Sequence, residues 1–150
     1  MLILCLIQQK MTRLVVPMEA LHHCVYSLNH HLVLVTEYHR RVLTGHMLTR
    51  FGVLAAERCD AWGGRMRECN GEPDHVPLLV TLPPAIALSK FVNALKTGTS
   101  RRLRAEFPDE VNRWYSKPAF WSRSYCVMSV GGAPLEVLKR YIKGQAGAGA

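Results

Sequence analysis

The sequence predicts one α+β domain built on an antiparallel sheet, and three observations support this prediction. The chain has 150 residues, the usual size of a single domain. Hydrophobic residues make up 49% of it, which is enough for a buried core. Strand-like and helix-like spacings of apolar residues follow one another in the order β-α-β-β-α-α-β-α. This order is that of the ferredoxin-like plan, in which helices cover one face of an antiparallel sheet.

The first half of the chain supplies three strands and one helix of this plan. Residues 31–37 carry apolar side chains on both faces, as a strand in the middle of a sheet does. Thr44 is suited to cap a helix whose apolar residues recur until about residue 59. A second strand is expected over 61–70, and an Asn-Gly turn joins it to a third strand over 74–82.

The second half is expected to contain more helix than strand. A helix starts near Leu88 and is expected to end near Gly98, because glycine often follows the last turn. A short basic helix then ends before Pro108. Residues 109–118 are expected to form a loop, and residues 120–130 the fourth strand. The last helix, which bears a tyrosine, is expected to run from Leu135 to about Gln145.

The ends of the chain differ in composition from the expected domain at 18–145. Residues 1–17 are expected to be an N-terminal extension, and residues 146–150, all Gly and Ala, a disordered tail. The apolar run at 1–7 is far shorter than the roughly 20 residues that span a bilayer. It also lacks the flanks of a signal peptide, so no membrane partner is expected.

Charge and cysteine content bear on partners and compartment. A formal charge of +8 favours a polyanionic partner such as nucleic acid, although a small basic protein can also lack a specific partner. Five cysteines without C-x-x-C spacing indicate reduced thiols and a cytoplasmic location, and argue against a zinc site.

His75 is a candidate metal ligand because of its position on the third strand. It shares a face with residue 77, and two imidazoles at that spacing could hold one divalent ion. Residue 77 is proline, however, which has no ligand atom and no backbone N–H for a neighbouring strand. The substitution is therefore expected to impair metal binding and to distort the strand. The alternative role for His75 is that of a hydrogen-bonded core histidine.

Tyr141 and Gln145 lie four residues apart on the last helix and therefore share one face. A tyrosine hydroxyl has a pKa near 10, so it becomes a nucleophile only with the help of a metal or a base. The alternative role for Tyr141 is that of a half-buried aromatic on an amphipathic helix.

Together these segments resemble the small single-tyrosine HUH transposases of the insertion-sequence-200 type. The resemblance is carried by Pro73-Asp74-His75-Val76, by Ser129 to Pro134, and by Arg140-Tyr141-Ile142, and it extends from about Val25 to Gln145. The family has His-hydrophobic-His where this chain has His75-Val76-Pro77.

The resemblance implies metal-dependent nicking and rejoining of single-stranded DNA hairpins at the ends of a mobile element. Tyr141 would form a 5′-phosphotyrosine, and His75 and Gln145 would bind Mg²⁺ or Mn²⁺. The family also implies a homodimer in which the tyrosine helix of one subunit completes the metal site of the other. With Pro77 present the site is expected to be dead or strongly impaired, unless metal binds weakly or Asp74 or Glu72 replaces the missing ligand.

Two other functions stay open: a non-catalytic, dimeric DNA-hairpin-binding protein, and a basic α+β domain with no nucleic-acid role. If DNA is the partner, basic residues are expected to contact phosphates, and nearby aromatic residues either stack on unpaired bases or pack in the core. The expected phosphate contacts are Arg40, Arg41, Lys90, Lys96, Arg101, Arg102, Arg104 and Arg123; the aromatic residues are Trp114, Tyr115, Phe120 and Trp121.

Overall fold

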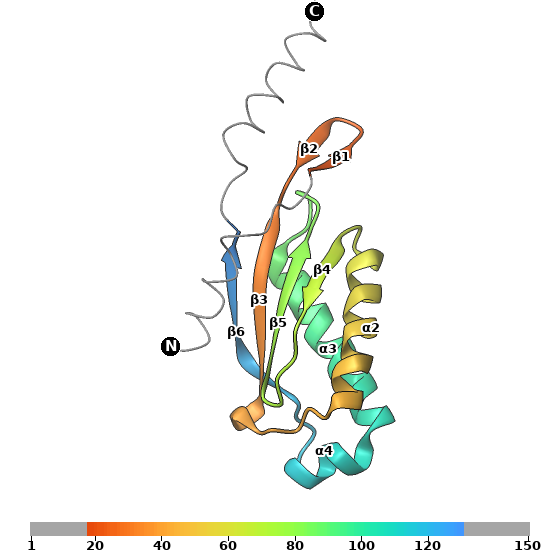
Figure 1. Ribbon diagram of the computed structural model, residues 1–150, viewed down its shortest axis with the longest axis vertical. Helices are drawn as coiled ribbons and strands as arrows, with labels where there is room; N and C mark the ends of the chain where they lie inside the picture. Colours follow the sequence, from red (N-terminus) through yellow and green to blue (C-terminus); the bar gives the residue numbers. More distant parts are fainter. Residues whose placement is uncertain (1–17, 131–150) are drawn as a thin grey trace, which may run out of the picture.

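The structure is a computed structural model that describes residues 18–130 (Figure 1). Its elements in chain order are β1 (Glu19–Leu21), β2 (Cys24–Tyr26), β3 (Asn29–Thr36), the short 3₁₀ helix η1 (Glu37–His39), α2 (Gly45–Ala61), β4 (Arg65–Cys69), β5 (His75–Thr81), α3 (Leu88–Glu106), α4 (Pro108–Trp114) and β6 (Trp121–Ser129).

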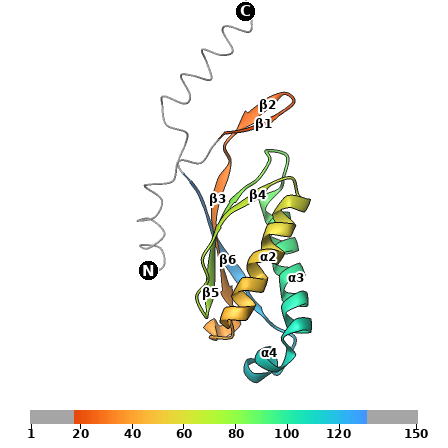
Figure 2. The same ribbon diagram turned by 45° about the vertical axis from the view of Figure 1, so that its right-hand side comes forward.

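The main sheet has four antiparallel strands in the order β4-β5-β3-β6. Helices α2 and α3 lie side by side against one face of it (Figure 2). Alternate residues of the central strands, such as Leu32 and Leu34 of β3 and Val76 and Leu78 of β5, are buried in the core that the sheet shares with the helices. The predicted ferredoxin-like α+β fold is confirmed.

Helix α2 begins where the sequence predicts but ends later. The Thr44 hydroxyl accepts a hydrogen bond from the Met47 amide at 3.3 Å, as an N-cap does. The helix continues to Ala61, and Gly63 then turns the chain with φ of +76°. The second strand of the main sheet therefore starts at Arg65, four residues after the predicted start at 61.

Helix α3 is one continuous helix, so the predicted break at Gly98 is wrong. The Thr99 hydroxyl donates to the Leu95 carbonyl at 2.7 Å, which satisfies the side chain inside the helix instead of at a cap. Gly98 lies against the Arg58 guanidinium of α2, which a Cβ at this position would displace. A glycine within the helix thus leaves room for this arginine between α2 and α3.

The region expected to be a loop at 109–118 contains helix α4. Pro108 occupies its first turn together with Asp109 and Glu110. Proline is favoured at that position, and acidic side chains there complement the helix dipole. These start signals are present in the sequence, so the expectation of a loop is wrong.

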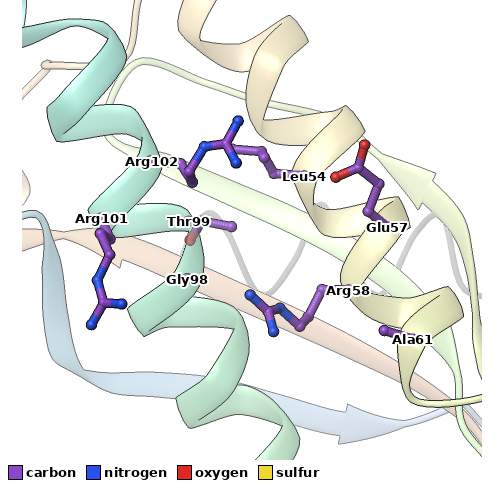
Figure 3. A pocket seen from close by; sticks show the side chains of 8 residues that line it. All are labelled: Leu54, Glu57, Arg58, Ala61, Gly98, Thr99, Arg101 and Arg102. Carbon is purple, nitrogen blue, oxygen red and sulfur yellow. The ribbon is translucent and has the colours of Figure 1, made fainter.

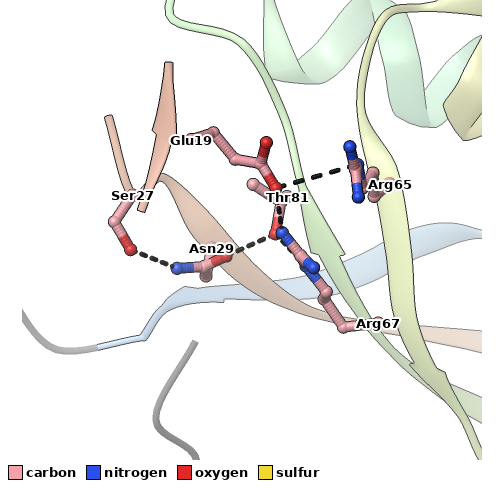
Figure 4. Close-up of polar contacts among 6 residues, drawn as sticks. All are labelled: Glu19, Ser27, Asn29, Arg65, Arg67 and Thr81. Atoms are coloured by element: carbon pink, nitrogen blue, oxygen red, sulfur yellow. Dashed lines mark hydrogen bonds and ion pairs between the residues drawn. The ribbon is translucent and has the colours of Figure 1, made fainter. Parts of the chain in front are cut away.

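The β1–β2 hairpin is a second addition that the sequence did not predict, and polar contacts fasten it to the main sheet (Figure 4). The Glu19 carboxylate of β1 forms an ion pair with Arg67 of β4, whose Nε also donates to the Thr81 hydroxyl at 3.0 Å. The Thr81 hydroxyl donates in turn to Asn29, which bonds the Ser27 hydroxyl at 2.8 Å. Such a short hairpin depends on contacts of this kind, because two strands alone are marginally stable.

The predicted extension at 1–17, the last helix at 135–145 and the tail at 146–150 lie outside the described residues. Within residues 18–130, none of the helices is both long and apolar enough to cross a membrane.

Candidate active site and basic depression

His75 lies at the first position of β5, on the sheet face opposite the helices. It pairs with Val35 of β3, while the next residue, Val76, points into the core. The ring is half-buried, and its Nδ1 lies 2.7 Å from Oδ1 of Asp74. A carboxylate on one ring nitrogen fixes the ring orientation and leaves Nε2 to face a ligand, as second-shell partners of metal-binding histidines do.

Asp74 is the group that positions His75. Partial burial acts to raise its pKa, but the hydrogen bond with His75 and the charges of His75 and Arg41 outweigh this effect, so the pKa of Asp74 is lowered. The side chain is therefore a carboxylate at neutral pH. Its Oδ1 is engaged with the His75 ring, which makes Asp74 a partner of that ring, and its role as a replacement ligand stays a prediction.

Pro77 shares the open face with His75 and leaves one side of β5 regular. The pairing of β5 with β3 runs without a register shift from Asn29–Thr81 to Val35–His75. The Pro77 carbonyl accepts a hydrogen bond from the Asn70 amide at 3.1 Å, so the N–H that proline lacks would also point toward Asn70. Asn70 is exposed and follows the end of β4. On this side the pairing of β4 with β5 shifts register between Met66 and Glu68 and ends at Cys69–Leu78, so the irregularity lies in β4 and not in β3.

The described residues supply one metal ligand here and not a complete set. Within residues 18–130, no three His, Cys, Asp or Glu side chains are grouped so that they could hold a metal ion. His75 fits the role, because Asp74 orients its ring, whereas Pro77 has no ligand atom. His31, on the same face, pairs with Leu79 and so lies four positions from Val35, or roughly 13 Å along the strand. It is too far away to replace residue 77.

His31 has a different environment from His75. It is only 7% exposed, and its Nε2 has no hydrogen-bond partner among residues 18–130. Burial lowers its pKa, and the nearby charge of Glu68 acts in the opposite direction. It is therefore a neutral histidine of the open sheet face, separate from the Asp74–His75 pair.

Tyr141 and Gln145, the predicted nucleophile and the second predicted metal ligand, lie outside the described residues. Their roles stay predictions. Of the predicted catalytic residues, the structure thus places His75 alone.

Several of the predicted DNA contacts surround one depression, which we call the basic depression. It has a volume of about 350 Å³ and lies between α3 and the start of β6, with Glu37 on its wall. Helical spacing brings Thr97, Ser100, Arg101 and Arg104 to one side of α3. The basic residues that line the depression are Lys96, Arg101, Arg104 and Arg123.

Lys96 also has a structural role in this depression. Its Nζ donates to the Arg123 carbonyl at 3.0 Å and lies 5.6 Å from the centroid of the Tyr125 ring. Burial lowers the pKa of Lys96, and the charge of Glu37 partly opposes this effect. Lys96 thus fastens α3 to β6, while Arg101 and Arg123 are exposed.

A second depression of about 390 Å³ lies between α2 and α3 (Figure 3). Arg101 lines both depressions, whereas Arg102 faces α2 and pairs with Glu106 at 3.3 Å. Arg58 enters this depression from α2 beside Gly98. Sequence reasoning did not include Arg58 among the predicted DNA contacts. The one sequence feature related to its position is Gly98, which lies opposite it on α3.

The remaining predicted DNA contacts lie elsewhere on the surface. Lys90 is exposed in the first turn of α3, and Arg40 and Arg41 are exposed in the segment after η1. Arg41 is close enough to Asp74 to lower its pKa. The predicted DNA contacts therefore form several groups instead of one patch.

Core packing explains three of the four aromatic residues. Tyr115, Phe120 and Trp121 are buried, and Trp121 Nε1 donates to the Thr99 hydroxyl at 3.0 Å. Trp114 is 41% exposed, so it alone of the four keeps a free ring surface.

Comparison with known proteins bears on what this arrangement does. The chain is 28% identical over 137 residues to the ISDra2 transposase TnpA of Deinococcus radiodurans, covering 90% of this chain and 97% of that protein. It is 28% identical over 127 residues to the transposase for insertion sequence element IS200 of Salmonella typhimurium, covering 85% and 82%.

Solved structures agree with these relatives. A crystal structure described as that of a transposase from Deinococcus radiodurans matches with a TM-score of 0.69 and 27% identity, over 85% of this chain and 98% of that one. A REP-associated tyrosine transposase bound to a REP hairpin matches with a TM-score of 0.51 and 10% identity, over 82% and 67%, which shows a shared fold. The model of the IS200-like transposase family matches residues 24–145, most of the chain and all of the main sheet, and the protein therefore belongs to that family.

Proposed function

We propose that this transposase binds single-stranded DNA hairpins and that any nicking and rejoining it performs proceeds through Tyr141, at a rate strongly reduced by Pro77. The observation that carries the proposal is the Asp74–His75 pair at the start of β5, with Pro77 on the same face two residues later. Asp74 orients the His75 ring for ligand binding, and Pro77, the next residue on the same face, offers no ligand atom.

The proposed chemistry assigns one task to each residue. Tyr141 would attack the DNA phosphorus, so that a tyrosine–phosphate bond forms at the 5′ side and the 3′ oxygen leaves. A divalent cation, held by His75 and Gln145, would supply Lewis-acid polarisation of the phosphodiester. The phosphotyrosine conserves the bond energy, so the strands can be rejoined without a nucleotide cofactor. Pro77 reduces the rate because it removes one ligand from this set.

DNA binding is assigned to the basic depression and its surroundings. Arg101, Arg104 and Arg123 present guanidinium groups around a hollow that suits phosphate oxygens. The structural neighbour bound to a REP hairpin supports a hairpin as the substrate class. We further propose that the protein acts as a homodimer, in which Tyr141 of one subunit reaches His75 of its partner.

The test is an adduct assay with a labelled single-stranded hairpin and Mn²⁺. The wild-type protein is expected to form a small amount of denaturant-resistant protein–DNA adduct that disappears in Tyr141→Phe. The variant should bind the hairpin as the wild type does, because only the hydroxyl is removed. An adduct of equal yield in Tyr141→Phe would exclude Tyr141 as the nucleophile.

The second candidate function is non-catalytic binding of DNA hairpins. One observation favours it: positions 75 and 77 carry one imidazole where the family has two, because Pro77 offers no ligand atom. In the same experiment this function gives salt-sensitive binding and no adduct in either protein. Absence of binding at low salt would exclude both candidates.

A further inference from the structure

Tyr38 has an unusual combination of backbone strain and exposure. Its φ is +57°, and that of the next residue, His39, is +55°, so two consecutive side chains other than glycine occupy the left-handed region. Tyr38 is also 74% exposed, more than any other large hydrophobic residue described. Its ring therefore contributes little to the core, while its backbone conformation costs energy. Strain of this kind persists where the surrounding structure enforces it, often at binding sites.

The surrounding structure does enforce this conformation. The Glu37 amide donates to the Phe120 carbonyl at 2.8 Å, and the Glu37 carbonyl accepts from the Tyr115 hydroxyl at 2.8 Å. The Arg40 carbonyl accepts from the Thr36 hydroxyl at 2.6 Å. Bonds on both sides of Tyr38 thus fix the segment and project the ring outward.

The segment links the two candidate sites. Glu37, immediately before Tyr38, lines the basic depression together with Phe120. The Thr36 amide donates to the Asp74 carbonyl at 3.0 Å, and Arg41 lowers the pKa of Asp74. The segment that carries the exposed Tyr38 ring therefore contacts both the hollow lined with arginines and the Asp74–His75 pair.

We propose that Tyr38 is a stacking platform for an unpaired base of the DNA strand that passes from the basic depression toward His75. This inference rests on the proposed function, since it names the part of the substrate that this surface recognises. A phosphate group of the strand can bind the guanidinium groups of the depression. The unpaired base of the same nucleotide can then stack on an aromatic ring nearby. The fixed backbone keeps the ring in place before DNA arrives, which reduces the entropy lost on binding.

The proposal is tested by measuring the affinity of the protein for two DNA hairpins. One hairpin carries a single-stranded flank and the other is blunt. Tyr38→Ala is expected to weaken binding of the flanked hairpin roughly ten-fold, and to leave the blunt hairpin unchanged. Tyr38→Phe, which keeps the ring, should bind both as the wild type does. Val53→Ala is the control, because it trims another exposed hydrophobic side chain, on α2, that does not line the depression.

Thermal unfolding separates recognition from a structural role. Tyr38→Gly removes the strained Cβ, so its melting temperature is expected to equal or exceed that of the wild type, while its affinity for the flanked hairpin falls as in Tyr38→Ala. A lower melting temperature with an unchanged ratio of flanked to blunt affinity would overturn the proposal. Equal affinity of wild type and Tyr38→Ala for the flanked hairpin would also overturn it. Failure of the wild type to bind either hairpin would instead overturn the proposed function.

Discussion

The Asp74–His75 pair and the basic depression differ in how many residues each depends on. At the start of β5 the described chain offers one imidazole, and the position that should supply a second is Pro77. The depression is lined by Lys96, Arg101, Arg104 and Arg123 on two elements. Loss of one ligand from a small metal-binding set is hard to replace, whereas loss of one cation among several weakens phosphate binding by a fraction. Under the proposed function, DNA binding is therefore less sensitive to the loss of one residue than the chemistry is.

The strongest test of this difference is Pro77→His. Hairpin adduct formation in Mn²⁺ is expected to increase about 100-fold or more, because even outer partners of metal ligands change affinity or activity by 10- to 100-fold. Affinity for the hairpin without metal should stay the same.

Pro77→Ala is the control for this change, because it restores the backbone N–H without an imidazole. It should form no more adduct than the wild type. If Pro77→His and Pro77→Ala give the same yield, then the missing ligand is not what limits the reaction.

Thr99→Val examines the scaffold behind the basic depression, because Thr99 bonds Trp121, which lines that depression. The change removes the acceptor of the buried Trp121 Nε1, so the free energy of unfolding is expected to fall by about 1–3 kcal/mol in urea titrations. Thr97→Val, at an exposed position of the same helix, should have a much smaller effect. Equal losses in the two variants would show that the Thr99–Trp121 bond does not stabilise the fold.

The depression itself is tested with Arg104→Gln combined with Arg123→Gln. The log–log salt dependence of hairpin binding is expected to become shallower by about 1.4, since each lost phosphate contact on a single strand contributes about 0.7. Arg65→Gln, on β4, removes one positive charge outside this depression and should leave the slope unchanged. A change of about 0.7 in Arg65→Gln, the same per charge as in the double variant, would mean that net charge, and not the depression, sets the affinity.

The smallest expected effect concerns the pH dependence of Asp74. Its pKa is lowered from the ordinary value of 3.8, so its contribution to stability is present above pH 3.8 and is lost as the pH falls through the lower folded-state value. Asp74→Asn should reduce the free energy of unfolding at pH 7 by less than about 1 kcal/mol, because solvent screens this partly exposed pair. The difference between the two proteins should shrink as the pH falls below 3.8; a difference that does not change with pH would point to a cause other than the carboxylate charge.

Sequence reasoning identified the main sheet because its patterns are local. The alternating apolar residues of β3 and the Thr44 cap of α2 are visible in short windows of sequence. It failed where distant contacts decide the outcome. Gly98 does not end α3, because it lies opposite Arg58 of another helix, and the β1–β2 hairpin depends on the ion pair between Glu19 and Arg67.

The candidate site was predicted in part for the same reason. The shared face of His75 and Pro77 follows from strand periodicity, and the structure agrees. The role of Asp74 as the partner of the His75 ring, and the separation of Arg102 from the basic depression, depend on side-chain positions that spacing does not specify. The positive φ of Tyr38 could not be predicted from its residue type, since tyrosine is disfavoured in that conformation.

The orientation of Pro77 has a consequence for how a chain of this kind can be recognised. Its absent donor points toward exposed Asn70, where water can take the place of the lost partner, so the sheet gives up about one hydrogen bond at its solvent-facing margin. Chains with proline or histidine there should have closely similar melting curves and circular dichroism spectra. Measurements of expression or folding would not distinguish the two chains. Only an assay of DNA nicking and rejoining would show a difference in activity between them.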